Sequence, residues 1–173
     1  MTAAYRPPRP LDPSDDLRAF TCRSGEQTSW LRRHARQANA TGTTRVFVVT
    51  TASRRDPAVA ASYAWCMAQV AIDGAPARVR RGAGRHPQPV ALLARLGVDV
   101  EHEGRGLGAA LLVDVVTRLV GIEEEIGCRG LLIHAESAEA RAFHLHLIPE
   151  LEPSPTDDLH LVLLMKDARR SLL

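Results

Sequence analysis

Alternating glycines at residues 103–109 are the part of this sequence whose residue types and spacing can do chemistry. The segment is Glu-Gly-Arg-Gly-Leu-Gly-Ala, between an apolar run typical of a buried strand and an amphipathic run typical of a helix. Glycine lets the backbone approach a phosphate closely, and the free N–H groups at a helix start attract one. The segment therefore predicts a phosphate-binding turn, to which Arg105 can add a charge-assisted contact.

Two common phosphate-binding fingerprints do not fit this segment. A dinucleotide-binding turn requires G-x-G-x-x-G, but the third glycine place is filled by Ala109 in one frame and by Leu111 in the other. A Walker loop requires a lysine directly after its glycines, and none follows here. An ordinary glycine turn at a helix start stays open as the alternative.

The string E-G-R-G-L-G-A-A-L-L resembles the acetyl-CoA motif of the GNAT superfamily of N-acetyltransferases, Q/R-x-x-G-x-G/A. Gly106 and Gly108 match its glycines, whereas Glu103 stands where the family has Gln or Arg, so weakened binding is expected there. The resemblance implies that backbone N–H groups of this loop bind the pyrophosphate, while the preceding strand contacts the pantetheine arm. The cofactor-binding residues it implies are Leu96, Gly97, Val98, Glu103, Gly104, Arg105, Gly106, Leu107, Gly108 and Ala109.

Shorter strings resemble the GNAT toxins of type II toxin–antitoxin modules. They are F-x-C at Phe20–Cys22, W-L at Trp30–Leu31, P-V-A-L-L-A-R-L-G-V-D, L-L-I-H-A, A-x-A-F and E-P-S-P. Such toxins acetylate the α-amine of aminoacyl-tRNA, which blocks translation, and a ribbon-helix-helix antitoxin neutralises them. The resemblance therefore implies acetyl-CoA as cofactor, aminoacyl-tRNA as substrate and such an antitoxin as partner. A homodimer is common in the family, but the sequence does not decide the oligomeric state.

His144 is the predicted catalytic residue and also a departure from that family. It follows the A-x-A-F string, where the toxins carry a tyrosine that returns a proton to the CoA thiolate. An imidazole with an ordinary pKa near 6.5 can exchange a proton near neutrality, so His144 can take this role. The alternative is a histidine that merely replaces the tyrosine on a helix face, in a weakened or inactive enzyme. His134, within an apolar strand, is expected to be a hydrogen-bonded core residue.

Basic residues are concentrated in the first part of the chain. Residues 1–100 hold 15 arginines against 7 acidic residues, whereas residues 101–173 hold 7 basic residues against 13 acidic ones. Because phosphate binding requires mainly positive charge, the arginines of the first helix and of a glycine-rich loop are candidates for tRNA contact. These are Arg32, Arg33, Arg36, Arg78, Arg80, Arg81 and Arg85. A mixed solvated surface, or a docking site for an acidic antitoxin tail, stays open.

Hydrophobic periodicity predicts the elements that position these residues. Strands are expected at 44–51, 59–72, 89–100, 130–136 and 159–165, and helices at 25–39, 106–126 and 138–147. Residues 73–89 are expected to be a surface loop, and residues 1–13 an extended N-terminal segment. This order indicates an α/β chain with a mixed sheet. The resemblance implies one GNAT domain over residues 1–173, with a central, mostly antiparallel sheet flanked by helices.

Composition excludes several other classes. No run of about 18 apolar residues is present, and the proline-rich start lacks a signal-peptide core, so a cytoplasmic protein that does not enter a membrane is expected. No histidine pair at i, i+4 or paired-cysteine motif occurs, so no metal is expected. Two rivals to the toxin remain: a stand-alone GNAT enzyme acting on a small amine or protein N-terminus, and a catalytically silent GNAT-fold binding protein.

Overall fold

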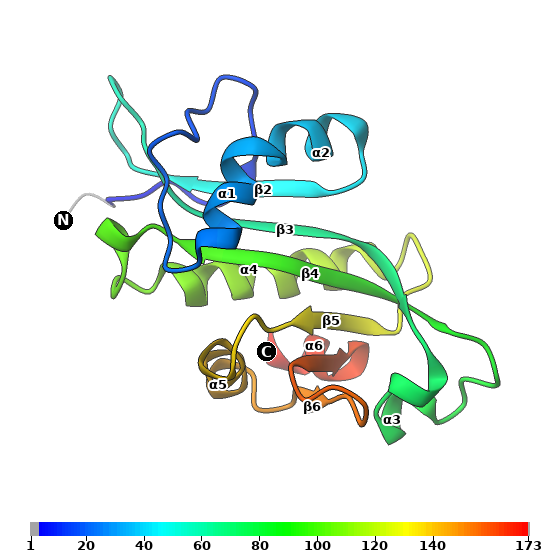
Figure 1. Cartoon of the computed structure of the whole chain (residues 1–173). Coiled ribbons are helices and arrows are strands. Elements are labelled where there is room, and N and C mark those ends of the chain that lie inside the picture. Colours follow the sequence, from blue (N-terminus) through cyan, green and yellow to red (C-terminus); the bar gives the residue numbers. More distant parts are fainter. Residues whose placement is uncertain (1–3, 173) are drawn as a thin grey trace. The chain divides into compact units, whose positions relative to one another are not determined.

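The computed structural model describes residues 4–172 (Figure 1). These residues group into two compact units: unit 1 comprises residues 4–66 and 94–114, and unit 2 comprises residues 67–93 and 115–172. Two strands and one helix contribute residues to both units.

The strands form one mixed sheet in the order β1-β2-β3-β4-β5-β7-β6. Their bounds are β1 Arg9–Pro10, β2 Arg45–Thr50, β3 Val59–Val70, β4 Gln88–Val98, β5 Gly130–His134, β6 Glu152–Pro153 and β7 His160–Leu164. The β4–β5 pair is parallel, whereas β1–β2, β2–β3, β5–β7 and β6–β7 are antiparallel. The predicted α/β fold with a mixed, mostly antiparallel sheet is confirmed.

Six α-helices and two short 3-10 helices lie in the described part of the chain. The α-helices are α1 Gly25–Arg33, α2 Ala35–Thr41, α3 Ala77–Arg80, α4 Leu107–Ile122, α5 Ala138–Leu147 and α6 Met165–Ser171. The 3-10 helices are Ile72–Gly74 and Val100–His102. Ser24 caps α1 by accepting a hydrogen bond from the Gln27 N–H, so this helix starts where the sequence predicts.

Unit 1 buries one face of α1 and α2 against β2. Leu31 and Ala35 pack with Val46 and Val48 in one apolar cluster, and Figure 1 shows both helices beside β2. The two helices correct the single helix expected at 25–39, because the chain breaks at His34, whose φ of −121° is not helical. No glycine or proline marks that break in the sequence.

Unit 2 has its own apolar cluster, in which Val79 of α3 packs with Val90, Leu132, Val162 and Leu164. The segment expected to be a loop at 73–89 therefore contains a short helix, because Val79 supplies an apolar anchor within it. A Cβ at Gly130 would lie 2.0 Å from the Leu163 carbonyl oxygen, so the β5–β7 contact requires glycine there.

Besides α3 and the two 3-10 helices, three short elements were not expected from the sequence: β1, β6 and α6. Two-residue strands have no measurable period, and α6 continues directly from β7 without a turn signal. The segment expected to be extended at residues 1–13 contains β1 and the isolated Tyr5–Thr51 bridge, and its first three residues lie outside the described part.

Candidate functional site

The glycine turn of unit 1 has the backbone that phosphate binding requires. Gly104 and Gly106 have φ of 71° and 78°, in the left-handed region that favours glycine. A Cβ built on either glycine would meet no atom within 4 Å, so the space beside both is open. The 16-residue helix α4 begins at Leu107, which leaves its first N–H groups without partners in the helix. This arrangement fits a phosphate group.

Asp99 fixes the chain that leads into the turn. One oxygen of its buried carboxylate accepts a hydrogen bond from the Thr21 N–H at 2.8 Å, and the other accepts one from the Glu101 N–H at 2.9 Å. The Val100 N–H also donates to the Thr21 carbonyl at 2.9 Å. These hydrogen bonds thus join the segment before α1 to the segment after β4, directly before the glycine turn in the chain.

Glu103, the departure from the acetyl-CoA motif, forms an ion pair with Arg23 at 2.9 Å. Two nitrogens of the guanidinium donate to the same carboxylate oxygen. An unpaired carboxylate beside the turn would repel a phosphate, and Arg23 offsets that charge. The sequence gives no signal for this compensation, because the two residues are 80 positions apart.

Arg105 is held by the N-terminal segment. Its guanidinium donates to the Tyr5 hydroxyl at 2.7 Å and to the Glu101 carbonyl at 3.3 Å, and the Tyr5 hydroxyl lies 2.9 Å from His102 Nδ1. The side chain is exposed and fixed near the turn rather than freely extended. The role of Tyr5 could not be predicted, since it is 100 residues from Arg105.

The remaining residues expected to bind the cofactor have different surroundings. Leu96, Gly97 and Val98 are half-buried at the end of β4, and a Cβ at Gly97 would lie 3.3–3.5 Å from Gln27 and Cys22. Leu107 is buried, so its backbone alone is available to a ligand, whereas Gly108 and Ala109 are half-buried on the first turn of α4.

His144 lies on α5 in unit 2 and is 5% exposed. Its Nδ1 atom is buried without a hydrogen-bond partner among the described residues. Burial lowers its pKa to about 4, because charging the imidazole there would require desolvation without compensation. The side chain is therefore neutral near pH 7, which the position of His144 in the sequence does not reveal.

His134 is exposed, which corrects the core position expected for it. It ends β5 opposite His160 of β7, and the two imidazoles stack with centroids 3.9 Å apart. His160 lies 3.5 Å from Asp157. The expectation was wrong because β5 leaves the apolar core at its last residue.

The arginines expected to contact tRNA fall into two groups. Arg32 and Arg36 donate to main-chain carbonyls at Phe20 and Asp15, and Arg78 pairs with Glu152 and Asp167. The others are exposed, with no side-chain partner among the described residues: Arg33 in unit 1, and Arg80, Arg81 and Arg85 in unit 2. The positive charges of this second group are therefore not offset by a carboxylate within the described residues and are available to an anionic ligand.

Within residues 4–172, no group of three His, Cys, Asp or Glu side chains could hold a metal ion. In the same residues, no helix is long and apolar enough to cross a membrane.

Comparison with known proteins identifies relatives over nearly the whole chain. A tRNA-acetylating toxin of Mycobacterium tuberculosis is 43% identical over 167 residues, which cover 96% of each chain. A probable toxin, TacT, of Sinorhizobium fredii is 27% identical and covers 93% of this chain and 92% of its own. No family model matches the chain.

Solved structures share the fold at lower sequence identity. A tyrosine-to-phenylalanine mutant of KacT has a TM-score of 0.88 at 19% identity and covers 97% of this chain and 99% of its own. AtaT complexed with acetyl-methionyl-tRNAfMet has a TM-score of 0.86 at 18% identity, covering 98% and 99%. An AtaT mutant bound to the C-terminus of the antitoxin AtaR and acetyl-CoA has a TM-score of 0.78 at 20% identity, covering 96% of each chain.

The mixed sheet, the glycine turn before α4 and these structural matches show that the chain has the GNAT fold of KacT and AtaT. The 43% identity over 96% of the chain shows the narrower group: the chain belongs to the family of tRNA-acetylating toxins.

Proposed function

We propose that this protein transfers the acetyl group of acetyl-CoA to the α-amine of an aminoacyl-tRNA and thereby blocks translation. The observation that carries the proposal is the open glycine turn at the start of α4, in a chain 43% identical to a tRNA-acetylating toxin. AtaT, which shares the fold, has been solved with acetyl-CoA and with an acetylated aminoacyl-tRNA. Because charged tRNA is cytoplasmic, we place the activity in the cytoplasm.

The glycine turn would hold the pyrophosphate of acetyl-CoA through main-chain N–H groups at the start of α4, where the helix dipole adds to the attraction. Gly104 and Gly106 leave the approach open, and Arg105 supplies a fixed positive charge. The half-buried residues Leu96, Gly97 and Val98 would line the pantetheine arm. Acetyl-CoA, when bound, supplies the acetyl group as a thioester.

Transfer requires that the amine lose one proton as the new C–N bond forms, and that the departing thiolate gain one as the C–S bond breaks. We propose that position 144 serves this return of the proton. His144 is poorly suited to it at pH 7, because burial lowers its pKa to about 4 and the side chain is then neutral. The native enzyme is therefore expected to be slow, with a tyrosine at this position the better donor.

The tRNA would be held mainly through its backbone by the exposed Arg80, Arg81 and Arg85, with Arg33 contributing from α1. Arg32, Arg36 and Arg78, which are engaged within the protein, would act by shaping these surfaces. A ribbon-helix-helix antitoxin is the proposed partner, and support comes from AtaT, which has been solved with the C-terminus of AtaR. Homodimer formation also remains a proposal.

One observation favours a second candidate function. The buried, neutral His144 in place of a proton-donating tyrosine is what a catalytically silent relative would carry, with binding of CoA or of a partner retained. In that case the wild-type protein would bind acetyl-CoA and tRNA but transfer no acetyl group, whereas H144Y would restore transfer.

Reversing the charge of exposed arginines distinguishes an enzyme that acetylates charged tRNA from one that acetylates small amines. R80E/R81E should lower acetyl transfer to charged tRNA at least tenfold at low salt, because two phosphate contacts are lost. Transfer to a small amine should be unchanged. R54E/R55E is the matched control, since both arginines are exposed in the β2–β3 turn and have no side-chain partner among the described residues. Equal loss of tRNA acetylation in both double variants, or in neither, contradicts the proposal.

A further inference from the structure

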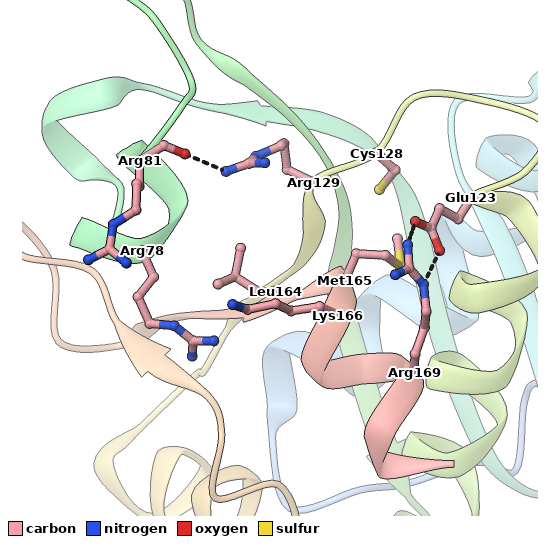
Figure 2. A pocket seen from close by; sticks show the side chains of 9 residues that line it. All are labelled: Arg78, Arg81, Glu123, Cys128, Arg129, Leu164, Met165, Lys166 and Arg169. Atoms are coloured by element: carbon pink, nitrogen blue, oxygen red, sulfur yellow. Dashed lines mark hydrogen bonds and ion pairs between the residues drawn. The ribbon is translucent and has the colours of Figure 1, made fainter. Parts of the chain in front are cut away.

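A hollow of about 340 Å³ lies in unit 2, formed by residues of α3, β7 and α6 and of the segments that follow α3 and α4. Figure 2 shows the side chains around it. The lining residues are Arg78, Arg81, Glu123, Cys128, Arg129, Leu164, Met165, Lys166 and Arg169. Five of these nine are cations and one is an acid, so the lining has a marked excess of positive charge.

Two of the cations are neutralised within the protein. Arg169 donates to both oxygens of Glu123, and Arg78 lies 2.7 Å from Glu152 and 2.8 Å from Asp167. The pKa of the Asp167 carboxyl is lowered, mainly by its hydrogen bond with Arg78. These pairs fix the walls of the hollow but contribute little net charge to it.

Within residues 4–172, three cations of the lining have no ion-paired carboxylate: Arg81, Arg129 and Lys166 (Figure 2). They come from the end of α3, the residue before β5 and the second residue of α6, so the fold brings together charges far apart in sequence. Arg129 is held by two carbonyls, since its Nη2 donates to Val79 at 2.8 Å and to Arg81 at 3.3 Å. Its Nε atom is buried without an acceptor among the described residues.

Holding three cations around a hollow is electrostatically unfavourable, and leaving a buried N–H without an acceptor adds to that cost. A bound anion would relieve the repulsion among the three cations. A phosphate group fits best, because it presents several acceptor oxygens to donors arriving from different directions, as three separate elements provide here. None of these residues belongs to the glycine turn. That turn lies before the first residue of α4, whereas Glu123 of the hollow follows its last residue.

We infer that this hollow is a phosphate-binding site, separate from the glycine turn, that anchors the backbone of the RNA substrate. RNA is favoured over a free phosphate ester because the exposed Arg80 and Arg85 continue the positive charge on either side of Arg81 in the chain. The assignment of RNA rests on the proposed function, whereas the phosphate site rests on the hollow itself.

Two binding measurements on the full chain test the inference. In the first, inorganic phosphate is titrated against the protein while backbone amide signals are followed by NMR. Signals of Arg81, Arg129 and Lys166 should shift in the wild type and in R55Q, but not in K166Q. Lys166 is exposed and Arg55 lies in an exposed turn of unit 1, so both variants should fold. Equal shifts in K166Q and the wild type, or no shift at these residues in the wild type, overturn the phosphate site.

In the second measurement, uncharged tRNA is bound at several salt concentrations. K166Q should weaken binding by roughly threefold to tenfold and reduce the slope of log affinity against log salt by about one, whereas R55Q should change neither. If poly-glutamate displaces tRNA and binds the wild type more tightly than tRNA does, the hollow is a peptide-docking site and the inference fails. If the wild type binds no tRNA but phosphate still shifts the three signals, the phosphate site stands and the proposed function fails.

Discussion

Folding stability should depend on pH through His144. An unfolded chain protonates this histidine near its ordinary pKa of 6.5, whereas the folded protein, with a pKa of about 4, does not until far lower pH. The unfolded state thus binds more protons between these values, so stability is fully present above pH 6.5 and is lost as pH falls toward 4. Because the side chain is 5% exposed, solvent screening is small.

The size of the effect follows from the two pKa values. At pH 5 the linkage relation gives a loss of about 2 kcal/mol relative to pH 7, approaching about 3 kcal/mol below pH 4. The assay is urea unfolding at pH 7 and pH 5 of the wild type and of H144F, whose ring cannot be protonated. The wild type should lose about 2 kcal/mol more than the variant, and comparison with H144F removes the contribution of His134 and His160.

The result that refutes this reasoning is an equal loss of stability in the two proteins. His144 would then be protonated as readily in the folded state as in the unfolded chain. H144F should also be at least as stable as the wild type at pH 7, because it removes a buried Nδ1 atom that has no partner.

Three further outcomes are expected. G106E should abolish acetyl-CoA binding measured by calorimetry, since the glutamate side chain would occupy the open space of the turn. The control G42E places glutamate at a nearly identical φ of 77° and should bind acetyl-CoA normally. Retained binding in folded G106E would contradict the site. In single-turnover acetylation, the rate of H144F should be within about tenfold of the wild-type rate, and H144Y should be about 100-fold faster than the wild type. The acetyl-CoA affinity of both variants should be unchanged. A rate lower by about 100-fold in H144F would show that His144 is an effective acid. G130A should lower the free energy of unfolding in urea by about 3 kcal/mol or more, because its Cβ would overlap the Leu163 carbonyl. A loss below about 1 kcal/mol would mean that β5 and β7 separate easily.

Local patterns predicted the fold well because hydrophobic residues recur with a clear helical or strand period in most of the elements. The amphipathic run that predicts α4 buries Leu107, Leu111, Val115 and Leu119. The glycine turn before it has the positive φ values that only glycine adopts readily. The break at His34 was missed, since no glycine or proline marks it in the sequence.

The site was less predictable because its remaining features depend on contacts between distant residues. Glu103 looked unfavourable for phosphate binding until its ion pair with Arg23 was seen. His144 was assigned an ordinary pKa, since sequence does not report burial on α5. Lys166 and Arg129 carried no motif, and only the fold brings them to the same hollow as Arg81.

The central claim is that the acceptor is the α-amine of an amino acid attached to tRNA. The most direct measurement incubates the purified protein, and H144Y in parallel, with acetyl-CoA and a pool of charged tRNAs. The amino acids are then released from the tRNA by mild base and weighed by mass spectrometry. The account predicts one or more amino acids that carry one added acetyl group on the α-nitrogen, formed slowly by the wild type and faster by H144Y. Unmodified amino acids with both proteins, while acetyl-CoA binding is intact, would contradict it.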